Sequence, residues 1–556
     1  MNRAFPSTVL AVALTVGLQA AGAEQSPPPT ETLATTRPTE SEAAAPAGSS
    51  PSVQWRLLPR RGSDHGDDAL RFALLPSTTD DGRWSDLDDE STRLKVQFQL
   101  PPKQPEAGAP PPPATTRLTY QYAYGSESDI VYRRNRDLHD LVRDNSLLLK
   151  PQLNGIIVYR PYDWLETVLE GILEWEIPVQ EESKVILPNG ELERAPKRRL
   201  SLLVDQAFVK VHQIISPFEI SVGRKNYEDE RHWLYDTSLD IASVAVKAGP
   251  FRIEATAGRE VYLDLDLAPN QRQPRDRIDT YILYADYRGI EDHRFAAYTI
   301  VRDDLLTEKQ RRLLERKTRA QLIGVRALGR PSDSFNYWIE IAQLIGKDGP
   351  SVGGPVRGGT PTKRFAAHGY DVGATYRFPW IPFSPSITVS YAVGSGDESP
   401  NDRHNNQFRQ SGLHTNETRF GGLSKFKIYG EALDPELSNI EIFTAGVGFR
   451  PFSNVFVDVV WHRYRLDEFA QSLSNSALTA EMNQVDPLRP RSKDVGSGLD
   501  LVIGFRRLFG LRRLGLDVRM GWFYPGQAFL RNQGDEEAPV IRRADQAMSV
   551  IAKFWW

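Results

Sequence analysis

The stretch that decides the fold is LLLKPQLNGIIVYR, residues 147–160. Read with a period of two residues, it places Lys150 and Gln152 on one face and Leu153 and Ile157 on the other. Such alternation is typical of a β-strand whose two faces meet different surroundings. One apolar and one polar face would suit a strand that separates lipid from a wet interior.

The same alternation recurs from Arg117 to the end of the chain, clearly so in FRIEATAGREV (251–261) and LGLDVRMGWFYP (514–525). Short tight turns and longer polar connections separate these stretches in turn, as in outer-membrane barrels. Counting them predicts about eighteen strands. We therefore expect an all-β, transmembrane, antiparallel up-and-down β-barrel over residues 117–556. Both chain termini should lie on the periplasmic side, and the interior should be filled with water.

The chain ends in MSVIAKFWW, residues 548–556. Val550, Phe554 and Trp556 share one apolar face, whereas Lys553 lies on the other face. This pattern predicts a last strand that closes the barrel against the first. Its aromatic face would then meet lipid at the girdle where barrels concentrate aromatic side chains.

The first 116 residues differ in composition from the rest. Residues 1–23 combine an apolar run with the small residues Ala21-Gly22-Ala23, which predicts a cleaved secretory signal peptide. Residues 24–116 are rich in Pro and Ala and predict a largely disordered periplasmic extension. A tether, a partner-docking segment and a weak internal plug all remain open for it.

The composition argues against catalysis and metal binding. The chain has no cysteine, nine scattered histidines and a net charge of −4. Neither His-Glu-x-x-His nor Gly-x-Ser-x-Gly occurs in it. We expect no catalytic residue, metal or cofactor. The basic segment LTEKQRRLLERKTR (306–319) has the charge pattern of a short exposed helix, so we expect no nucleic-acid partner.

Three further stretches carry a resemblance to a known family. FRQSGLHTNETRFGGLSKFKIYGEALDPELSNIEIFTAGVGFRP (408–451), VGRKNYEDERHWLYDTSLD (222–240) and GWFYPGQAF (521–529) resemble segments of the alginate export family of outer-membrane porins. The first of them is similar to a long external loop and the strand that follows it. The resemblance covers roughly residues 117–556.

The resemblance implies a monomeric eighteen-stranded barrel that passes an anionic polyuronate through a basic constriction. Arginine suits that task because its planar fork pairs with carboxylates. The positions that match basic residues of the family, and that we therefore expect at the constriction, are Lys150, Arg224, Arg519, Arg419, Lys425 and Lys427.

Three features depart from the family pattern. Gln121 stands where the family has a lysine, and Asp205 stands near a family arginine. The turn at 507–513 is shorter than the periplasmic plug that the family carries there. From these departures we expect fewer cations at the constriction and a different gate.

Three functions stay open at this point. The first is a channel in the cell outer membrane that exports an anionic exopolysaccharide, with outer-membrane lipid and periplasmic polysaccharide-export proteins as partners. The second is a diffusion porin for small anionic solutes or oligouronates, and the third is a barrel that acts mainly as an anchor or docking platform. Any single inward cation has a plain alternative as well, a structural ion pair inside the lumen.

Overall fold

The computed structural model describes most of the chain from residue 119 onward. The described residues are 72–73, 96–98, 119–138, 145–181, 198–212, 217–259, 264–266, 278–304, 318–348, 363–399, 402–470, 473–474, 478, 492–511, 513–529, 531–533, 540–542 and 546–556. The predicted signal peptide lies outside them, and so does nearly all of the predicted extension.

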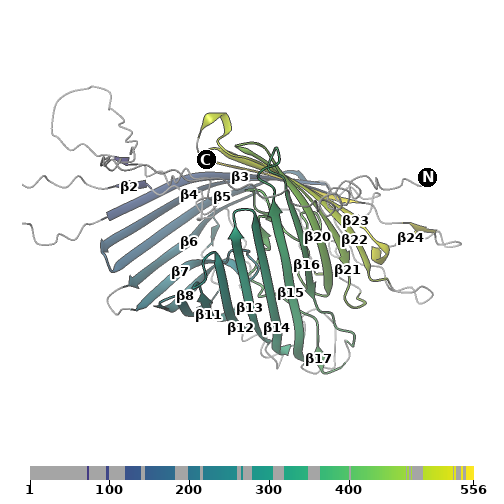
Figure 1. The fold of residues 1–556 in the computed structure, drawn as a ribbon, viewed down its shortest axis with the longest axis horizontal. Helices are drawn as coiled ribbons and strands as arrows, with labels where there is room; N and C mark the ends of the chain where they lie inside the picture. The colour runs from purple at the N-terminus through teal and green to yellow at the C-terminus, as the bar shows by residue number, and fades with distance from the viewer. Residues whose placement is uncertain are drawn as a thin grey trace, which may run out of the picture. The chain divides into compact units, whose positions relative to one another are not determined.

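Eighteen antiparallel strands form a closed barrel, which confirms the predicted fold class. Their order around the wall is their order along the chain (Figure 1). The strands are β3 (Thr119–Arg134), β4 (Ser146–Tyr162), β5 (Leu165–Glu181), β6 (Arg199–His212), β7 (Phe218–Glu228), β8 (Asp236–Ala248), β9 (Phe251–Arg259), β11 (Ile278–Tyr287), β12 (His293–Asp304), β13 (Arg319–Ser332), β14 (Phe335–Asp348), β15 (Lys363–Arg377), β16 (Ser386–Gly394), β20 (Ile440–Phe452), β21 (Val455–Arg465), β22 (Asp494–Phe505), β23 (Gly515–Pro525) and β26 (Ala547–Trp555).

The last strand closes the barrel as the C-terminal sequence predicts. β26 pairs with β3 from Met548↔Arg134 to Trp555↔Glu127. Phe554 and Trp556 are 39% and 46% exposed on the outside, whereas Ser549 is buried within. Lys553 forms an ion pair with Glu127. The apolar face of MSVIAKFWW is therefore the outer face of the closing strand.

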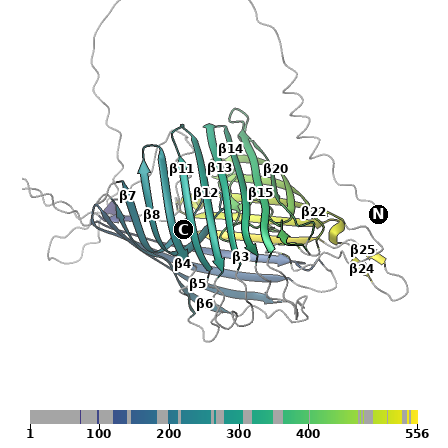
Figure 2. The same cartoon turned by 90° about the horizontal axis from the view of Figure 1, so that it is seen from below.

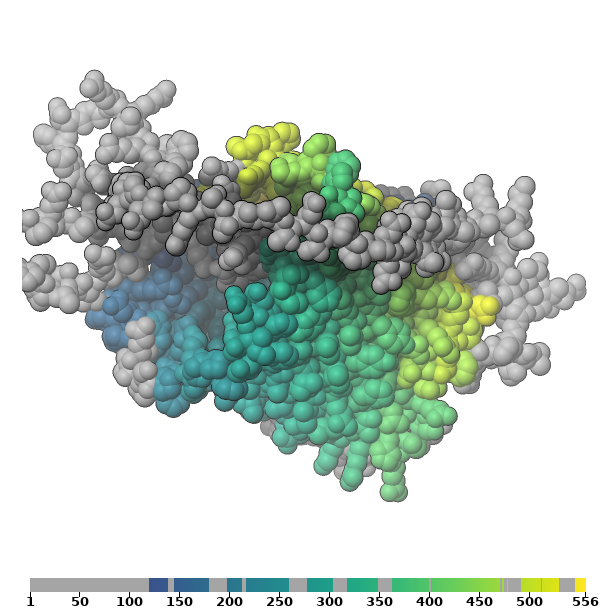
Figure 3. All heavy atoms as spheres, in the orientation of Figure 1, coloured from purple at the N-terminus to yellow at the C-terminus, as the bar shows by residue number. Residues whose placement is uncertain are grey.

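Alternation holds along the other strands too. In β16, Val389 and Tyr391 are exposed while Thr388 and Ser390 are buried. Outward-facing side chains of β11–β16 make one continuous outer surface (Figure 3). Outward apolar and inward polar side chains are what a strand between lipid and a polar lumen requires.

The two ends of the barrel differ in their connections. Two-residue turns join β4 to β5, β8 to β9, β13 to β14 and β20 to β21. We call this the short-turn end, which is the periplasmic end in barrels of this kind. Strands β3–β6 lie side by side in the view from below (Figure 2).

A loop occupies part of the interior that the sequence predicts to be filled with water. Residues 402–439, here called the lumen loop, lie in the connection between β16 and β20 and fold against inward-facing side chains of the wall. Phe408, Phe426 and Leu437 of this loop are fully buried. The sequence predicts a polar external loop for this segment. It lies inside because its aromatic and aliphatic side chains form an apolar cluster within the barrel.

Little of the extension is described. β1 (Phe72–Ala73) pairs with β2 (Val96–Phe98), and β2 pairs with β3 from Val96↔Tyr122 to Phe98↔Tyr120. That edge of β3 lies beyond the reach of β26, whose pairing ends at Glu127. Among the described residues, no helix is long and apolar enough to cross a membrane.

Candidate functional site: the charged lumen

The lumen loop spans the depth of the barrel. Gly421 and Gly422 lie against Ser386, the first residue of β16 at the short-turn end, and against Asp458 of β21. A Cβ atom on Gly421 would overlap Ser386 Oγ, and one on Gly422 would overlap the Asp458 carboxylate. Glycine is therefore needed at both positions for the close approach. We call residues 420–424 the tip of the loop.

Arg519 of β23 is a wall cation that pairs with carboxylates of the lumen loop. Its Nη1 lies 3.2 Å from Glu417 Oε1 and 3.3 Å from Glu431 Oε1, and both glutamates belong to the loop. Arg519 is only 6% exposed. Two loop carboxylates thus occupy the space in front of this guanidinium.

The two glutamates respond differently to their surroundings. Burial opposes the charge of Glu417, but Arg519, Lys427 and Lys553 outweigh it and lower the pKa of Glu417 to about 2. For Glu431 burial is the stronger effect, and it raises the pKa to about 7 despite Arg519. One of the two carboxylates is firmly charged, and the other is close to its protonation midpoint at neutral pH.

Lys425 and Lys427 lie on the loop itself and hold it to its surroundings. Lys425 Nζ lies 2.7 Å from Glu228 Oε1, at the end of β7. Lys427 Nζ donates to the carbonyl oxygen of Thr415 at 2.9 Å and lies 3.4 Å from Asp434. The structure therefore brings these two predicted residues into the lumen together with Arg519.

Lys150 faces inward on a different part of the wall. It shares its face with Gln152 and Asn154, and its Nζ lies 2.6 Å from Glu176 Oε1 of β5. Both side chains are partly exposed. Lys150 therefore forms a structural ion pair, which is the alternative to a constriction role that the sequence leaves open.

Arg224 occupies a different kind of position. It shares the face of β7 with Val222, which is 55% exposed, and pairs with Asp240 at 3.3 Å. Asp240 in turn shares the face of β8 with the exposed Val244. The alternation thus puts Arg224 on the outer face of the wall, apart from the other predicted residues, although its side chain is buried there.

Arg419 follows β18 (Glu417–Thr418), which pairs with β19 (Phe426–Lys427) in the lumen loop. Its side chain is half-buried. Arg419 therefore belongs to the same loop as Lys425 and Lys427, two residues from the glutamate that contacts Arg519.

A buried ionic network surrounds the β7–β8 loop, residues 229–235, and was not predicted from the sequence. Asp229 accepts hydrogen bonds from the backbone N–H groups of Leu234 and Tyr235 at 2.8 and 2.9 Å. Its other oxygen lies 2.7 Å from Arg326 Nη2 of β13. This network fixes the loop to the inside of the wall, and the clustered charges of NYEDERH were the available signal.

Arg231 of the same loop reaches the lumen loop through two partners. Its Nη2 lies 2.7 Å from Asp371 Oδ2, and its guanidinium stacks on Trp338 at 4.2 Å. Tyr429 of the lumen loop donates to the same Asp371 oxygen at 3.0 Å. The two inward-folded loops are therefore joined through one wall carboxylate.

Three groups at the barrel interior have the composition of a metal site, namely Glu228, His232 and Asp236. However, His232 Nε2 lies 2.6 Å from Glu228 and Nδ1 lies 2.8 Å from Asp236. Lys425 Nζ lies 3.1 Å from Nε2. A carboxylate facing each ring nitrogen favours a charged imidazolium, and the ammonium group of Lys425 disfavours a metal ion at the same place.

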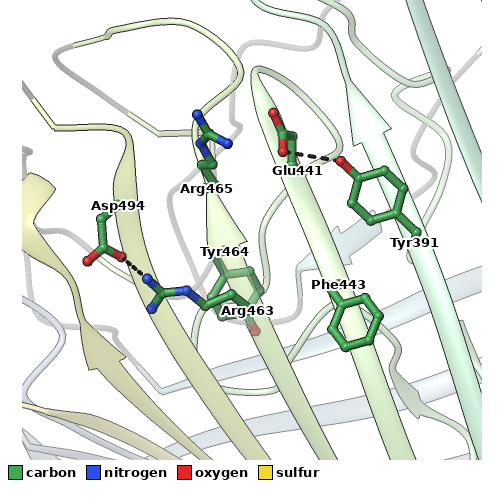
Figure 4. A pocket seen from close by; sticks show the side chains of 7 residues that line it. All are labelled: Tyr391, Glu441, Phe443, Arg463, Tyr464, Arg465 and Asp494. Atoms are coloured by element: carbon green, nitrogen blue, oxygen red, sulfur yellow. Dashed lines mark hydrogen bonds and ion pairs between the residues drawn. The ribbon is translucent and has the colours of Figure 1, made fainter.

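A pocket of about 300 Å³ lies at the long-loop ends of β16 and β20–β22, and it is distinct from the lumen (Figure 4). Its polar groups satisfy one another, because Arg463 pairs with Asp494 at 2.9 Å and Tyr391 donates to Glu441 at 3.1 Å. Tyr391 and Phe443 belong to the outward faces of their strands. The candidate site is therefore the lumen and not this pocket.

Comparison with known proteins identifies the architecture. The family model for alginate export matches residues 114–542. The chain belongs to the alginate export family. This membership and the closed eighteen-stranded barrel together make it a multi-pass channel of the outer membrane.

Individual relatives of this alginate export family member are distant. The alginate production protein AlgE of Azotobacter vinelandii is 26% identical over 167 residues, which cover 27% of this chain and 34% of that protein. The match thus spans about a third of the relative's length. Among solved structures, OccK11 (OpdR) of Pseudomonas aeruginosa has a TM-score of 0.43 at 10% identity over 79% of this chain and 95% of its own. OccD3 (OpdP) of the same organism has a TM-score of 0.44 at 9% identity over 78% and 91%.

The structure shows where the three departures from the pattern of the alginate export family lie. Gln121 of β3 pairs in register with Val158 of β4 and with Gln97 of β2. Asp205 accepts a hydrogen bond from Ser238 Oγ at 2.6 Å. Instead of a long plug, the turn after β22 holds one short helical turn, η2 (Leu508–Gly510). The lumen loop occupies part of the interior.

Proposed function

We propose that this channel exports an anionic exopolysaccharide of the alginate type, a polyuronate, through a basic path in its lumen. One observation supports the proposal above the others. Arg519, a buried cation of the wall, has two carboxylates of the lumen loop as its neighbours. A uronate carboxylate is the same chemical group, so the loop glutamates stand where those of the substrate would bind.

The proposed path of the polymer follows if uronate carboxylates replace the loop glutamates at Arg519. Withdrawal of the lumen loop would free the Arg519 guanidinium for a passing uronate. Lys425 and Lys427 would move with the loop, and Arg419 lies on the same segment. Several weak cationic contacts along a path let a polyanion enter without being held too tightly at any point. Lys150 would add a further inward contact, whereas Arg224 on the outer face has no place on this path.

A permanently open diffusion pore for small anions fits less well, because the apolar cluster of the lumen loop occupies the interior. We therefore propose a channel that at rest is closed to the polymer and passes only small ions. We also propose that it works as a monomer without catalysis, with outer-membrane lipid around it and periplasmic polysaccharide-export proteins as partners at the short-turn end.

Planar bilayers containing the full chain test the proposal. We expect the wild type to prefer anions and uronate oligomers to reduce the chloride current. Arg519→Gln should weaken both effects, because the lumen loses a cation that low local dielectric leaves poorly screened. Arg224→Gln is the matched control and should change neither.

Cation preference of the wild type, or equal block by neutral glucan oligomers, would remove the anionic-polymer proposal. Free passage of small anions with no block by uronate oligomers would instead favour the diffusion porin. If deletion of the extension abolished polymer secretion while the barrel still conducted anions, the docking-platform function would take its place.

A further inference from the structure

Three cationic side chains form a row on the outer face of the barrel, near its long-loop end. Arg319, Lys347 and Arg364 belong to the adjacent strands β13, β14 and β15 (Figure 1). Lys347 lies directly opposite Arg319 on one side and directly opposite Arg364 on the other. All three are exposed. An even number of residues separates each of them from a lipid-facing side chain of its own strand, namely Ile323, Ile341 and Val372.

Within the described part of the chain, none of these three side chains has an ion-pair partner. Asp303 of β12 lies opposite Arg319 in the sheet, but the two form no ion pair. The pattern differs elsewhere on the outer face, where Arg259 lies opposite Asp279 and pairs with it at 2.6 Å. Like charges that lie directly opposite each other in a sheet are destabilising. The row therefore costs stability unless an anion lies between its members.

The sequence already signals one member of the row. Arg319 is the last residue of the basic segment LTEKQRRLLERKTR (306–319). The short exposed helix predicted for this segment lies outside the described residues up to residue 317. Arg319 itself is the first residue of β13, so it is fixed in the wall.

The row lies where the apolar band of the barrel ends. Lys347 and Tyr337 lie ten positions apart on the outward face of β14. At a rise of about 3.3 Å per residue and a tilt of about 40°, this spacing amounts to roughly 25 Å along the membrane normal. The lipid-facing band of outer-membrane barrels has about that height, with an aromatic girdle at each edge. Tyr337 lies in such a girdle at the short-turn end, where the rings of Phe335 and Tyr376 are 6.5 Å apart. The three cations therefore lie at the level of the headgroups of the outer leaflet.

Two polar side chains lie beneath the row on the same outer face. Gln343 of β14 and His368 of β15 are directly opposite each other, and both are exposed. Each lies four residues from the cation of its own strand. Side chains on the lipid-facing band are ordinarily apolar. An amide and an imidazole at this depth can instead form hydrogen bonds with hydroxyl or amide groups of a lipid.

We propose that Arg319, Lys347 and Arg364 bind the phosphate groups of a phosphorylated glycolipid in the outer leaflet of the outer membrane. Gln343 and His368 bind the sugar or amide groups of the same lipid. Guanidinium and ammonium groups form strong, charge-assisted contacts with phosphate, and a basic cluster at a membrane surface attracts anionic headgroups. A bound phosphate would also offset the repulsion within the row. The site faces lipid and not the lumen, so it does not depend on the proposed transport function.

Retention of the lipid tests the site. The full chain is purified in a non-ionic detergent and titrated with diphosphoryl lipid A, a glucosamine disaccharide lipid with two phosphates. Bound lipid is counted by native mass spectrometry. In Arg319→Gln/Lys347→Gln we expect binding to be about tenfold weaker than in the wild type, because two charge-assisted contacts are lost.

The matched control is Arg259→Gln/Arg463→Gln, which removes two outward arginines that already pair with carboxylates. It should bind the lipid as the wild type does, and a heat-modifiable band should show that both variants are folded. Equal binding by the wild type and by folded Arg319→Gln/Lys347→Gln would overturn the site.

The chemistry of the lipid is tested separately. Lipid A without phosphates should bind the wild type more weakly, and so should phosphatidylglycerol, which has a phosphate but no sugar. Gln343→Leu/His368→Leu should weaken the binding of lipid A and not that of phosphatidylglycerol. Equal binding of phosphatidylglycerol and lipid A to the wild type, or displacement of lipid A by millimolar inorganic phosphate, would overturn the glycolipid as the ligand.

Reversal of one charge separates repulsion from ligand binding. Lys347→Glu places a carboxylate opposite both Arg319 and Arg364. In phosphatidylcholine vesicles, which offer no net negative headgroup, we expect a higher urea midpoint than for the wild type. Binding of diphosphoryl lipid A should fall further than in Lys347→Gln. A midpoint no higher than that of the wild type would remove the repulsion from which the site is inferred, and undiminished lipid binding would overturn the site itself.

Discussion

At the scale of single residues, ion pairs that join the two inward-folded loops to the wall hold the lumen together. Arg519 pairs with Glu417, Arg326 with Asp229, and Lys425 with Glu228. Removal of one partner from a buried pair leaves an uncompensated charge, which typically costs about 3–5 kcal/mol. The exposed pair between Lys425 and Glu228 is worth far less, since solvent screens it. The buried pairs therefore fix the closed state.

His232 makes the stability of the folded barrel depend on pH. Burial opposes its charge, but hydrogen bonds to Asp236 and Glu228 outweigh burial and raise its pKa to about 9. Because this lies above the ordinary value of 6.5, the contribution to stability is complete below about pH 6.5 and is lost as the pH rises through about 9. We expect the urea midpoint of the barrel in lipid vesicles to fall across that window.

The control for this titration is His232→Gln, which keeps hydrogen-bonding groups but cannot be charged. Its urea midpoint should be lower at pH 6.5 and should change much less between pH 6.5 and 9. An equal slope in both proteins would assign the pH dependence to other groups.

At the scale of elements, the decisive features are two loops folded inward between regular strands. The strands and the closing face of β26 could be predicted, because period-two alternation is local. The position of the lumen loop could not, since its polar composition is equally typical of an external loop. Arg519 and Glu417 are 102 residues apart in sequence, so nothing local signals their contact. For Arg224 the resemblance to the family predicts a position in the lumen. Its spacing of two residues from the exposed Val222 instead indicates the outer face.

Glycine at the tip of the lumen loop yields an element-scale prediction. Gly421→Val and Gly422→Val place side chains where Ser386 and Asp458 already lie, so the tip should be pushed from its seat. We expect a larger single-channel conductance in both variants. Gly155→Val is the control, because a Cβ atom there meets nothing within 4 Å. Conductance equal to that of the control would mean that the tip does not close the path.

The β7–β8 loop offers a second prediction at this scale. Asp229→Ala removes the acceptor of two backbone N–H groups and the partner of Arg326. The loop should loosen, so trypsin added to the folded, heat-modifiable barrel should cleave after Arg231 several-fold faster than in the wild type. Protection equal to the wild type would show that the apolar contacts of Trp233 and Leu234 hold the loop without Asp229.

At the scale of the whole molecule, a closed barrel has charged side chains inside and an outer face adapted to lipid. Closure depends on the pairing of β26 with β3 from Glu127 to Arg134, which makes no use of the extension. Deletion of residues 24–116 should therefore leave a barrel that inserts and remains heat-modifiable on gels. Failure to insert would mean that the pairing of β2 with β3 belongs to the folded barrel.

Passage of a polyanion through the lumen can be measured as transport. Proteoliposomes containing the full chain are loaded with a fluorescent uronate oligomer or with a neutral glucan oligomer of equal length, and release is followed over time. We predict faster release of the uronate than of the glucan, and a difference that shrinks in Arg519→Gln. Equal release of the two oligomers would show that the lumen does not select for a polyanion. Retention of both oligomers while small anions escape would show that it does not pass the polymer.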